Sequence, residues 1–284
     1  MDISIGILFG MVALFGWGAS DFCVAKSARG ASPFKAFFWS QLVALSLMLP
    51  IFLLFFRLPQ FSFAVIALLA ISGILSAVSN FSFYKSLQVG KVSIVMPVGS
   101  CWAVVTVLLS LTLLHEVLTA TQAFGISLAI GGAVLVSFKW KDLMRFRNRT
   151  KGLNYAVIAA LAFGADFVVI DLLVSEIGWF LPVFFVSAIT AFFLFLYSGA
   201  AKKDISFPKN ILLFIILVGA LDTVAYLSYS SGVTSEYSAI VAPIGAASPA
   251  VSIILARIFF KEKLHFNQKI GAVSVLAGLI LLSL

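Results

Sequence analysis

Two aspartates lie deep inside long apolar segments of the chain. Asp222 is near the middle of the helix predicted at 209–232, and Asp166 lies well inside the helix predicted at 152–174. A carboxylate at bilayer depth costs roughly 2.5–3.5 kcal/mol on insertion scales, so it normally faces protein or a water-filled cavity. Such a group can bind a proton or a cation, and competition between the two would give antiport. The alternative for both residues is burial with helix–helix hydrogen bonds.

Other polar side chains recur on helix faces that could complete such a cavity. Tyr226 and Tyr229 follow Asp222 at i+4 and i+7, on the same face of the helix. The third predicted helix carries a narrow polar stripe with spacings of three and four residues, made of Gly73, Ser76, Asn80 and Tyr84. A stripe of this kind can line a cavity or allow tight helix packing, and the sequence leaves both interpretations open.

The first predicted helix contributes Trp17 and Asp21, which are also spaced i, i+4. Asp21 and Asp171 lie nearer to helix ends, where solvation or pairing with Lys26 is the simpler interpretation. Trp102 could contact a cationic or aromatic substrate through its π face, or it could pack at a helix interface. We interpret the other aromatic residues, mostly the 29 Phe, as lipid contacts and packing.

Prolines and glutamates also occupy matched positions. Pro97 and Pro243 lie within predicted helices, where a proline removes one backbone hydrogen bond and kinks the helix. Their matching favours a hinge or a cavity-shaping bend, and the alternative is a static kink. Glu116 and Glu262 lie in short turns between helices. We interpret them as helix-end or ion-pair residues, with a role in gating as the second reading.

The elements that must position these residues are membrane helices. Hydrophobic residues make up 62% of the 284 residues, charged residues make up 11%, and the mean hydropathy is +1.14. The chain is thus more apolar and less charged than a soluble globular domain. A helix of about 20 apolar residues spans the hydrocarbon layer of about 30 Å. We predict an all-α, multi-pass membrane protein whose first helix is retained and not cleaved as a signal peptide. The ten predicted helices are 3–25, 34–56, 61–86, 92–114, 118–138, 152–174, 179–200, 209–232, 237–259 and 266–284.

Basic residues are segregated among the loops between these helices. If the N-terminus is outside, the cytoplasmic loops and adjoining helix ends hold all of the 19 Lys and Arg residues except Arg57. By the positive-inside rule, both termini are predicted to be extracytoplasmic, in the cell (plasma or inner) membrane. The net charge of +8 is therefore assigned to cytoplasmic loops and not to a nucleic-acid surface.

The chain also contains an internal repeat on either side of the basic segment 139–151. The segment that begins at Ser93 resembles the segment that begins at Ser238. When the two are aligned on their prolines, the offset is 146 residues. The matched pairs are Pro97/Pro243, Gly99/Gly245, Glu116/Glu262, Gly125/Gly271 and Gly132/Gly278. We divide the chain into five-helix halves, 1–138 and 152–284, joined by the basic linker. Because five is odd, the second half enters the membrane inverted relative to the first.

This arrangement resembles the drug/metabolite transporter superfamily, specifically its EamA-like ten-helix exporters. The resemblance covers essentially the whole chain and is strongest in MPVGS with LLHE in the first half, and APIGA with FFKE in the second. It implies a basket-like bundle around a central cavity, with the fifth and tenth helices peripheral and alternating access for small metabolites. One departure is that His115 precedes Glu116, whereas Lys261 precedes Glu262.

The sequence carries no signature of an enzyme. His115 and His265 are predicted at opposite membrane faces, so they cannot share a metal site or a catalytic triad. Cys23 and Cys101 form no framework of disulfides or metal ligands, and no glycine-rich phosphate loop is present. We expect no enzymatic activity, no cofactor, no metal site and no nucleic-acid partner, with gradients supplying the energy.

The favoured hypothesis is a secondary transporter, an exporter of small metabolites such as amino acids or amphipathic cations, with proton coupling through Asp166 and Asp222. One alternative is an uncoupled facilitator for sugars or nucleotide-sugars, for which only Lys85 and Arg257 could bind an anion. Another is a non-transporting membrane scaffold. The expected partners are a small-molecule substrate and the lipid bilayer. The presence of both halves favours a functional monomer, and a dimer stays open.

Overall fold

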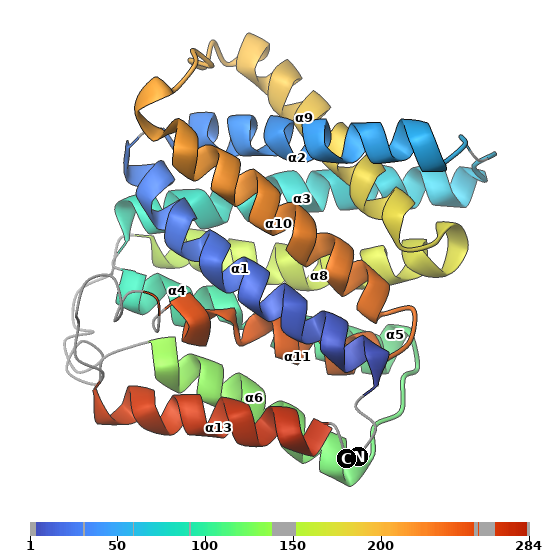
Figure 1. The fold of residues 1–284 in the computed structure, drawn as a ribbon, viewed down its shortest axis with the longest axis vertical. Helices are drawn as coiled ribbons and strands as arrows, with labels where there is room; N and C mark the ends of the chain where they lie inside the picture. Colours follow the sequence, from blue (N-terminus) through green and yellow to red (C-terminus); the bar gives the residue numbers. More distant parts are fainter. Residues whose placement is uncertain are drawn as a thin grey trace.

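A computed structural model describes residues 4–30, 32–58, 60–90, 92–137, 152–252, 255 and 265–282 (Figure 1). Within these ranges the chain is helical and contains no β-strand. The elements are α1 (Ile5–Gly30), α2 (Pro33–Phe55), α3 (Phe63–Val89), α4 (Val92–Ser100), α5 (Trp102–Leu113), α6 (Ala120–Ser137), α8 (Leu153–Ile177), α9 (Phe180–Ala200), a 3₁₀ turn (Lys209–Ile211), α10 (Leu212–Gly232), α11 (Ser238–Ala246) and α13 (Phe266–Leu282).

The helices have the lengths and composition of membrane spans. In the described part of the chain, six are long and apolar enough to cross a membrane, and four shorter apolar helices cover 98–113, 120–136, 238–252 and 266–282. The predicted all-α class with ten spans is confirmed. Helix ends follow local chemistry: Ser32 and Ser62 each accept a hydrogen bond from the backbone N–H three residues later, at 3.2 Å, and so cap α2 and α3.

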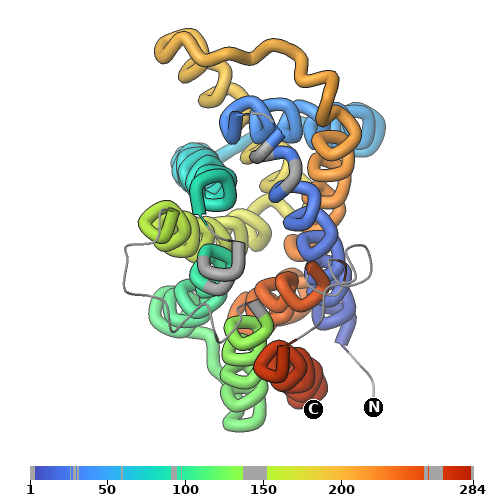
Figure 2. Tube along the Cα trace, turned by 90° about the vertical axis from the view of Figure 1, so that its left-hand side faces the viewer, coloured from blue at the N-terminus to red at the C-terminus, as the bar shows by residue number. Residues whose placement is uncertain are grey.

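Helix contacts repeat in a way that reflects the two inverted halves. Helix α1 packs against α10, and α3 packs against α8. If α1 corresponds to α8 and α3 to α10, these two interfaces are the same contact formed twice. Helices α6 and α13, the fifth and tenth spans, pack together at one edge of the bundle in both views (Figures 1 and 2). Their peripheral position agrees with the expectation from sequence.

The fourth span of each half is broken at the equivalent residue. Helix α4 ends before Cys101 and α11 ends before Ala247, and these two positions are 146 residues apart. At each break the N–H bonds to the carbonyl three residues earlier, Cys101 to Val98 and Ala247 to Ile244, both at 3.2 Å. The spans predicted at 92–114 and 237–259 are therefore interrupted, and each interruption lies four residues after the proline at which a kink was predicted.

A proline stands four residues before each break. Pro97 and Pro243 have no backbone N–H, so each span also lacks the helical hydrogen bond to the carbonyl four residues before the proline. The 3₁₀-like turn lies on the C-terminal side of that gap, and the helix resumes after it. Whether these bends act as hinges stays a prediction.

Paired glycines allow α6 and α13 to approach closely. A Cβ at Gly132 would lie 2.7 Å from the carbonyl oxygen of Gly271, and a Cβ at Gly278 would lie 2.6 Å from the carbonyl oxygen of Gly125. Small residues at an interface let two membrane helices bring their backbones into contact. The repeated glycines identified in the sequence therefore hold the peripheral pair together.

One carboxylate ties the two halves together at the end of the bundle. Glu116, in the loop between α5 and α6, accepts hydrogen bonds from the N–H groups of Ser238 at 3.0 Å and Ala239 at 2.9 Å. These are the first residues of α11, whose N–H groups have no partner within the helix. Burial raises the pKa of Glu116, and the two N–H bonds act in the opposite direction. Glu116 is thus a helix-capping residue, while Glu262 lies outside the described residues.

An ion pair joins the first turn of α2 to the loop that follows α9. The charge distribution assigns both segments to the same side of the membrane. Lys35 pairs with Asp204 and donates a hydrogen bond to Ser206 Oγ at 2.9 Å. Hydrogen bonding from the Lys35 ammonium lowers the pKa of Asp204 to about 2. It is the only salt bridge found in the described ranges. The linker 139–151 falls outside those ranges.

Replacing Gly132 with alanine tests the helix contact. We expect Gly132→Ala to destabilise the protein by about 1–3 kcal/mol, because the added methyl group would overlap backbone atoms of α13. Gly131→Ala is the matched control, since nothing lies within 4 Å of a Cβ there. Thermal unfolding of the purified protein in detergent would measure both. Equal melting temperatures for the two variants would contradict this account of the interface.

Removing the carboxylate of Glu116 tests the tie between halves. Glu116→Ala leaves two half-buried N–H groups without an acceptor, and we expect a loss of about 1–3 kcal/mol in the same unfolding assay. Glu116→Gln keeps one oxygen and should recover part of that loss. Val117→Ala in the same loop is the control, because Val117 is exposed and should tolerate truncation. A Glu116→Ala protein as stable as the control would show that the cap contributes nothing.

Candidate functional site

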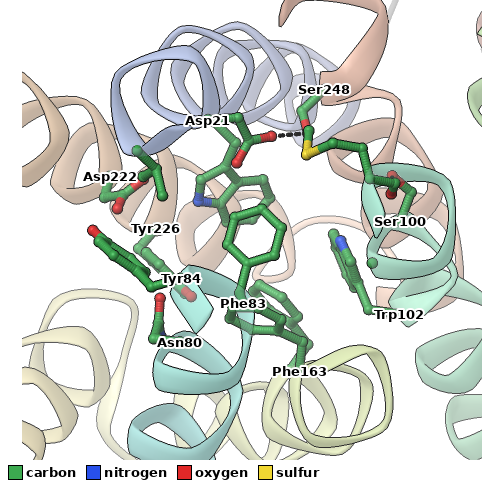
Figure 3. Close-up of a pocket in the computed structure, with 15 residues that line it drawn as sticks. Asp21, Asn80, Phe83, Tyr84, Ser100, Trp102, Phe163, Asp222, Tyr226 and Ser248 are labelled. Carbon is green, nitrogen blue, oxygen red and sulfur yellow. Dashed lines mark hydrogen bonds between the residues drawn. The ribbon is translucent and has the colours of Figure 1, made fainter. Parts of the chain in front are cut away.

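A cavity lies at the centre of the bundle, and we call it the aromatic chamber (Figure 3). Its walls come from α1, α3, α8 and α10, together with the residues around the breaks in the two fourth spans. The lining residues are Trp17, Asp21, Val24, Asn80, Phe83, Tyr84, Met96, Gly99, Ser100, Trp102, Phe163, Phe167, Asp222, Tyr226 and Ser248.

Aromatic rings in contact with one another form one wall of this chamber. Trp17 meets Trp102 at 5.8 Å and 83° between ring planes, and it meets Tyr226 at 5.3 Å and 82°. Phe167 lies 4.3 Å from the Trp102 ring and stacks on Tyr226 at 5.7 Å. Contacts of this kind add to the stability that burial gives and fix ring orientation. The ring faces can also attract a cation that enters the chamber.

Two carboxylates share the chamber with these rings. Asp21 Oδ2 accepts a hydrogen bond from Ser248 Oγ at 3.2 Å, and Asp222 lies within electrostatic range of Asp21 (Figure 3). No Lys, Arg or His is among the residues that line the chamber. Charged groups in a low-dielectric site must be neutralised or paired. A bound proton or a bound cation is therefore the natural partner of this pair.

A second cavity adjoins the first, and we call it the polar chamber. Asp166 lies in its wall, is only 2% exposed, and accepts a hydrogen bond from Ser72 Oγ at 2.5 Å. The lining residues are Gln41, Ala44, Met48, Ser76, Asn80, Asp166, Ile170, Val183, Val186, Ser187, Asp222, Thr223 and Tyr226. Asn80, Asp222 and Tyr226 line both chambers and form a partition between them.

Eight of the residues singled out from sequence come together around these chambers. Asp166 lines the polar chamber, and the other seven line the aromatic chamber: Trp17, Asp21, Asn80, Tyr84, Trp102, Asp222 and Tyr226. Tyr84 is held in place by a hydrogen bond of 3.2 Å between its hydroxyl and Ser40 Oγ. Pro243 is buried within α11 and lines neither chamber. Pro97 lies in α4 beside the lining residue Met96.

The other residues interpreted from the sequence occupy different kinds of position in the structure. Helix α1 continues to Gly30, so Asp21 is well inside its helix, and its hydrogen-bond partner is Ser248; the side chain of Lys26 lies outside the described part. Tyr229 does not line a chamber, and its hydroxyl lies 3.4 Å from Ser238 Oγ. In the polar stripe of α3, Asn80 and Tyr84 line a cavity, whereas Gly73 packs against Ile189 of α9.

Several chamber residues were missed from the sequence. Phe83, Phe163 and Phe167 were interpreted as lipid contacts or packing, and Ser248 was not considered. Ser72, which donates to Asp166 but lines neither chamber, was also not considered. The offset of 146 residues could have found three of them, because it maps Trp17 to Phe163, Asp21 to Phe167 and Trp102 to Ser248. Equivalent residues of inverted halves meet around the axis that relates the halves. The repeat is therefore a guide to the cavity as well as to the fold.

Comparisons with known proteins agree with this architecture. A protein described as an uncharacterized transporter, from Archaeoglobus fulgidus, is 26% identical over 280 residues, which cover 98% of each chain. An uncharacterized protein of Methanocaldococcus jannaschii is 34% identical over 137 residues, which cover 48% of this chain and 98% of that protein. A crystal structure of 17% sequence identity superposes with a TM-score of 0.75, covers 97% of this chain and 95% of its own, and so shares the fold.

The family comparison covers both halves of the repeat. Residues 4–138 and 150–284 each match the profile of the EamA-like transporter family. The chain therefore belongs to the EamA-like transporter family.

Proposed function

We propose that this protein is a secondary transporter that exports small metabolites, amino acids or amphipathic cations, by alternating access coupled to protons. The observation that carries the proposal is the position of Asp222. It stands at the partition between two cavities, well inside an apolar helix, with no Lys, Arg or His among the residues that line either cavity. A carboxylate held at this depth is typical of a proton or substrate path.

Alternating access is supported by the inverted halves. When two halves of equal fold are inverted, exchanging their conformations converts an inward-open state into an outward-open one. The breaks at Cys101 and Ala247 occur at equivalent residues, so each half has the same deformable position in its fourth span. Both breaks adjoin lining residues of the aromatic chamber, namely Ser100, Trp102 and Ser248. A change at either break would alter the chamber directly.

Proton coupling follows from charge balance in the chambers. Asp21 and Asp222 cannot both stay ionised in a dry cavity without a compensating charge. A proton or a cationic substrate can supply that charge, and each excludes the other. Exchange of one for the other on opposite sides of the membrane gives antiport, which exports the cation as protons enter.

The alternatives are less well supported by the same geometry. A nucleotide-sugar needs a basic site, but Lys85 donates to Gln88 at the end of α3, and Arg257 lies outside the described residues. A scaffold that does not transport would gain stability by filling its interior, because cavities in a protein core reduce stability. Two adjoining cavities that share polar walls favour transport over a scaffold.

The proposal extends to location and partners. We place the protein in the cell (plasma or inner) membrane with both termini extracytoplasmic, on the basis of the positive-inside rule. Its partners would be the bilayer and a small-molecule substrate, with no nucleic acid and no cofactor. The presence of both halves in one chain supports a functional monomer, and a dimer stays open.

Transport in proteoliposomes tests the proposal. We expect a pool of amino acids and organic cations to drive a pH change, reported by an internal dye, in liposomes that contain the wild-type protein. Asp222→Asn and Asp166→Asn should reduce that signal by about tenfold or more, because each removes a titratable group at bilayer depth. Glu176→Gln on exposed helix surface is the matched control.

Two results would contradict the proposal. Labelled substrates that equilibrate with no movement of protons would make the protein a uniporter. The absence of both transport and proton movement, in a protein that is folded in the liposomes, would favour the scaffold.

A further inference from the structure

The two chambers differ sharply in chemistry. Tyr226, on the shared partition, is the only aromatic residue in the lining of the polar chamber, whereas the aromatic chamber is walled by seven aromatic side chains. The polar chamber instead presents amide, hydroxyl and carboxyl groups, from residues that include Gln41, Ser76, Ser187 and Thr223. Rings favour a flat apolar body with a positive charge. The polar chamber also has apolar walls, from Ala44, Met48, Ile170, Val183 and Val186, but it holds the carboxylate of Asp166 with the hydroxyl of Ser72 beside it. A buried carboxylate of this kind can bind a proton.

The repeat indicates that the two chambers lie side by side in the plane of the membrane. The offset of 146 residues pairs Gln41 with Ser187, and Asn80 with Tyr226. Gln41 donates a hydrogen bond to the Ser187 carbonyl at 3.4 Å in the polar chamber, and Asn80 and Tyr226 both stand at the partition. Such pairs meet at the axis that relates inverted halves, and this axis lies in the membrane plane. Sites placed along it therefore share one depth.

This arrangement removes the polar chamber from the substrate's path. A molecule that crosses the membrane through the aromatic chamber moves perpendicular to the axis, so it has no need to pass Asp166. A proton on Asp166 can therefore be exchanged without passing through the site that the substrate occupies.

Few titratable groups surround Asp166. Asp222 and Tyr226 of α10 line the same chamber, and Tyr229 lies within electrostatic range on that helix. Helices α2, α3 and α9 contribute only uncharged side chains to the lining, and the hydrogen bond to Asp166 comes from Ser72 of α3. Asp222 is thus the one acidic residue that lines both chambers. It shares the polar chamber with Asp166 and the aromatic chamber with Asp21.

We propose that the two chambers bind different ligands: the aromatic chamber takes an organic ammonium ion with a flat apolar body, and the polar chamber holds the coupling proton on Asp166. Asp222 at the partition transmits the charge of one ligand to the other. This inference rests on the transport function proposed above and assigns separate roles to its carboxylates. Asp21 and Asp222 then bind substrate, while Asp166 binds the proton.

Calorimetric binding to the purified full-length protein in detergent tests the substrate class. The probes are phenethylamine as the cation, 2-phenylethanol as its neutral counterpart and 3-phenylpropionate as an anion of similar size. We expect phenethylamine to bind about tenfold more tightly than either of the others, since only the ammonium group can pair with Asp21 and Asp222. Equal binding of the three probes, or no binding of the amine, would overturn the assignment of this chamber.

Matched substitutions test the division between chambers. Asp21→Asn should weaken phenethylamine binding by about tenfold or more, whereas Asp166→Asn should change it by less than about threefold at pH 8.5. Titration in two buffers of different ionisation enthalpy counts the protons released on binding. We expect Asp166→Asn to release fewer than half of the protons that the wild type releases, and Glu176→Gln to behave as the wild type.

A single undivided site gives a different pattern. Equal losses of affinity for Asp21→Asn and Asp166→Asn, with proton release unchanged by Asp166→Asn, would overturn the division. Ser72→Ala is a second variant that keeps the carboxylate of Asp166 and removes its hydrogen-bond donor. Ser72→Ala should shift the pH dependence of amine binding and leave the affinity at pH 8.5 unaltered. A pH dependence identical to that of the wild type would also count against the proposal.

The outcome is separable from that of the transport assay. If other substrates drive proton movement in liposomes while phenethylamine shows no chamber-specific pattern, the transport function stands and the division of the chambers falls. If no substrate moves and no protons move, the transport function itself fails.

Discussion

Carboxylates buried inside the bundle are removed from bulk water and must be stabilised by hydrogen bonds from other parts of the chain. These hydrogen bonds connect the two halves of the structure. Ser72 of the first half donates to Asp166 of the second, and Ser248 of the second half donates to Asp21 of the first. Glu116 of the first half caps α11 of the second. Each of these hydrogen bonds crosses between the halves. Any movement of one half against the other must therefore exchange the partners of its acidic groups.

The backbone of the two halves is nearly equivalent, but their charges are not. The offset that superposes the helix breaks and the glycine contacts also maps Ser76 to Asp222 and Ser20 to Asp166. At these positions, one half carries a hydroxyl where the other carries a carboxyl. Equal backbones give two conformations of similar energy, which exchange of the halves interconverts. Unequal charges allow a proton or a cation to favour one conformation over the other.

Close packing and local breaks have different places in the same bundle. Helices α6 and α13 are in backbone contact through their glycines, so this edge behaves as one unit. The breaks at Cys101 and Ala247, each four residues after a proline, lie beside the aromatic chamber. The backbone contacts and the interrupted helices thus occupy separate parts of the bundle, one at its edge and one at the cavity.

Sequence alone determined the class of protein, the ten spans, the inverted halves and the depth of Asp222 and Asp166. These properties are readable because hydropathy along the chain reports a fixed membrane thickness, and because the offset of 146 residues persists through the repeat. The helix breaks, by contrast, required the local backbone: a proline indicates a bend, but neighbouring helices decide whether the helix resumes and where.

Only the tertiary structure decided which helix faces look into a cavity. In a soluble protein the polar face marks the surface, but here lipid is as apolar as the interior, so hydropathy does not distinguish a phenylalanine that faces the chamber, such as Phe167, from one that faces lipid. The partition of Asn80, Asp222 and Tyr226 likewise depends on the approach of α3 and α10 across the axis of the repeat. Residues far apart in sequence meet there because inversion of the second half brings equivalent faces together, and that is a property of packing and not of either helix alone.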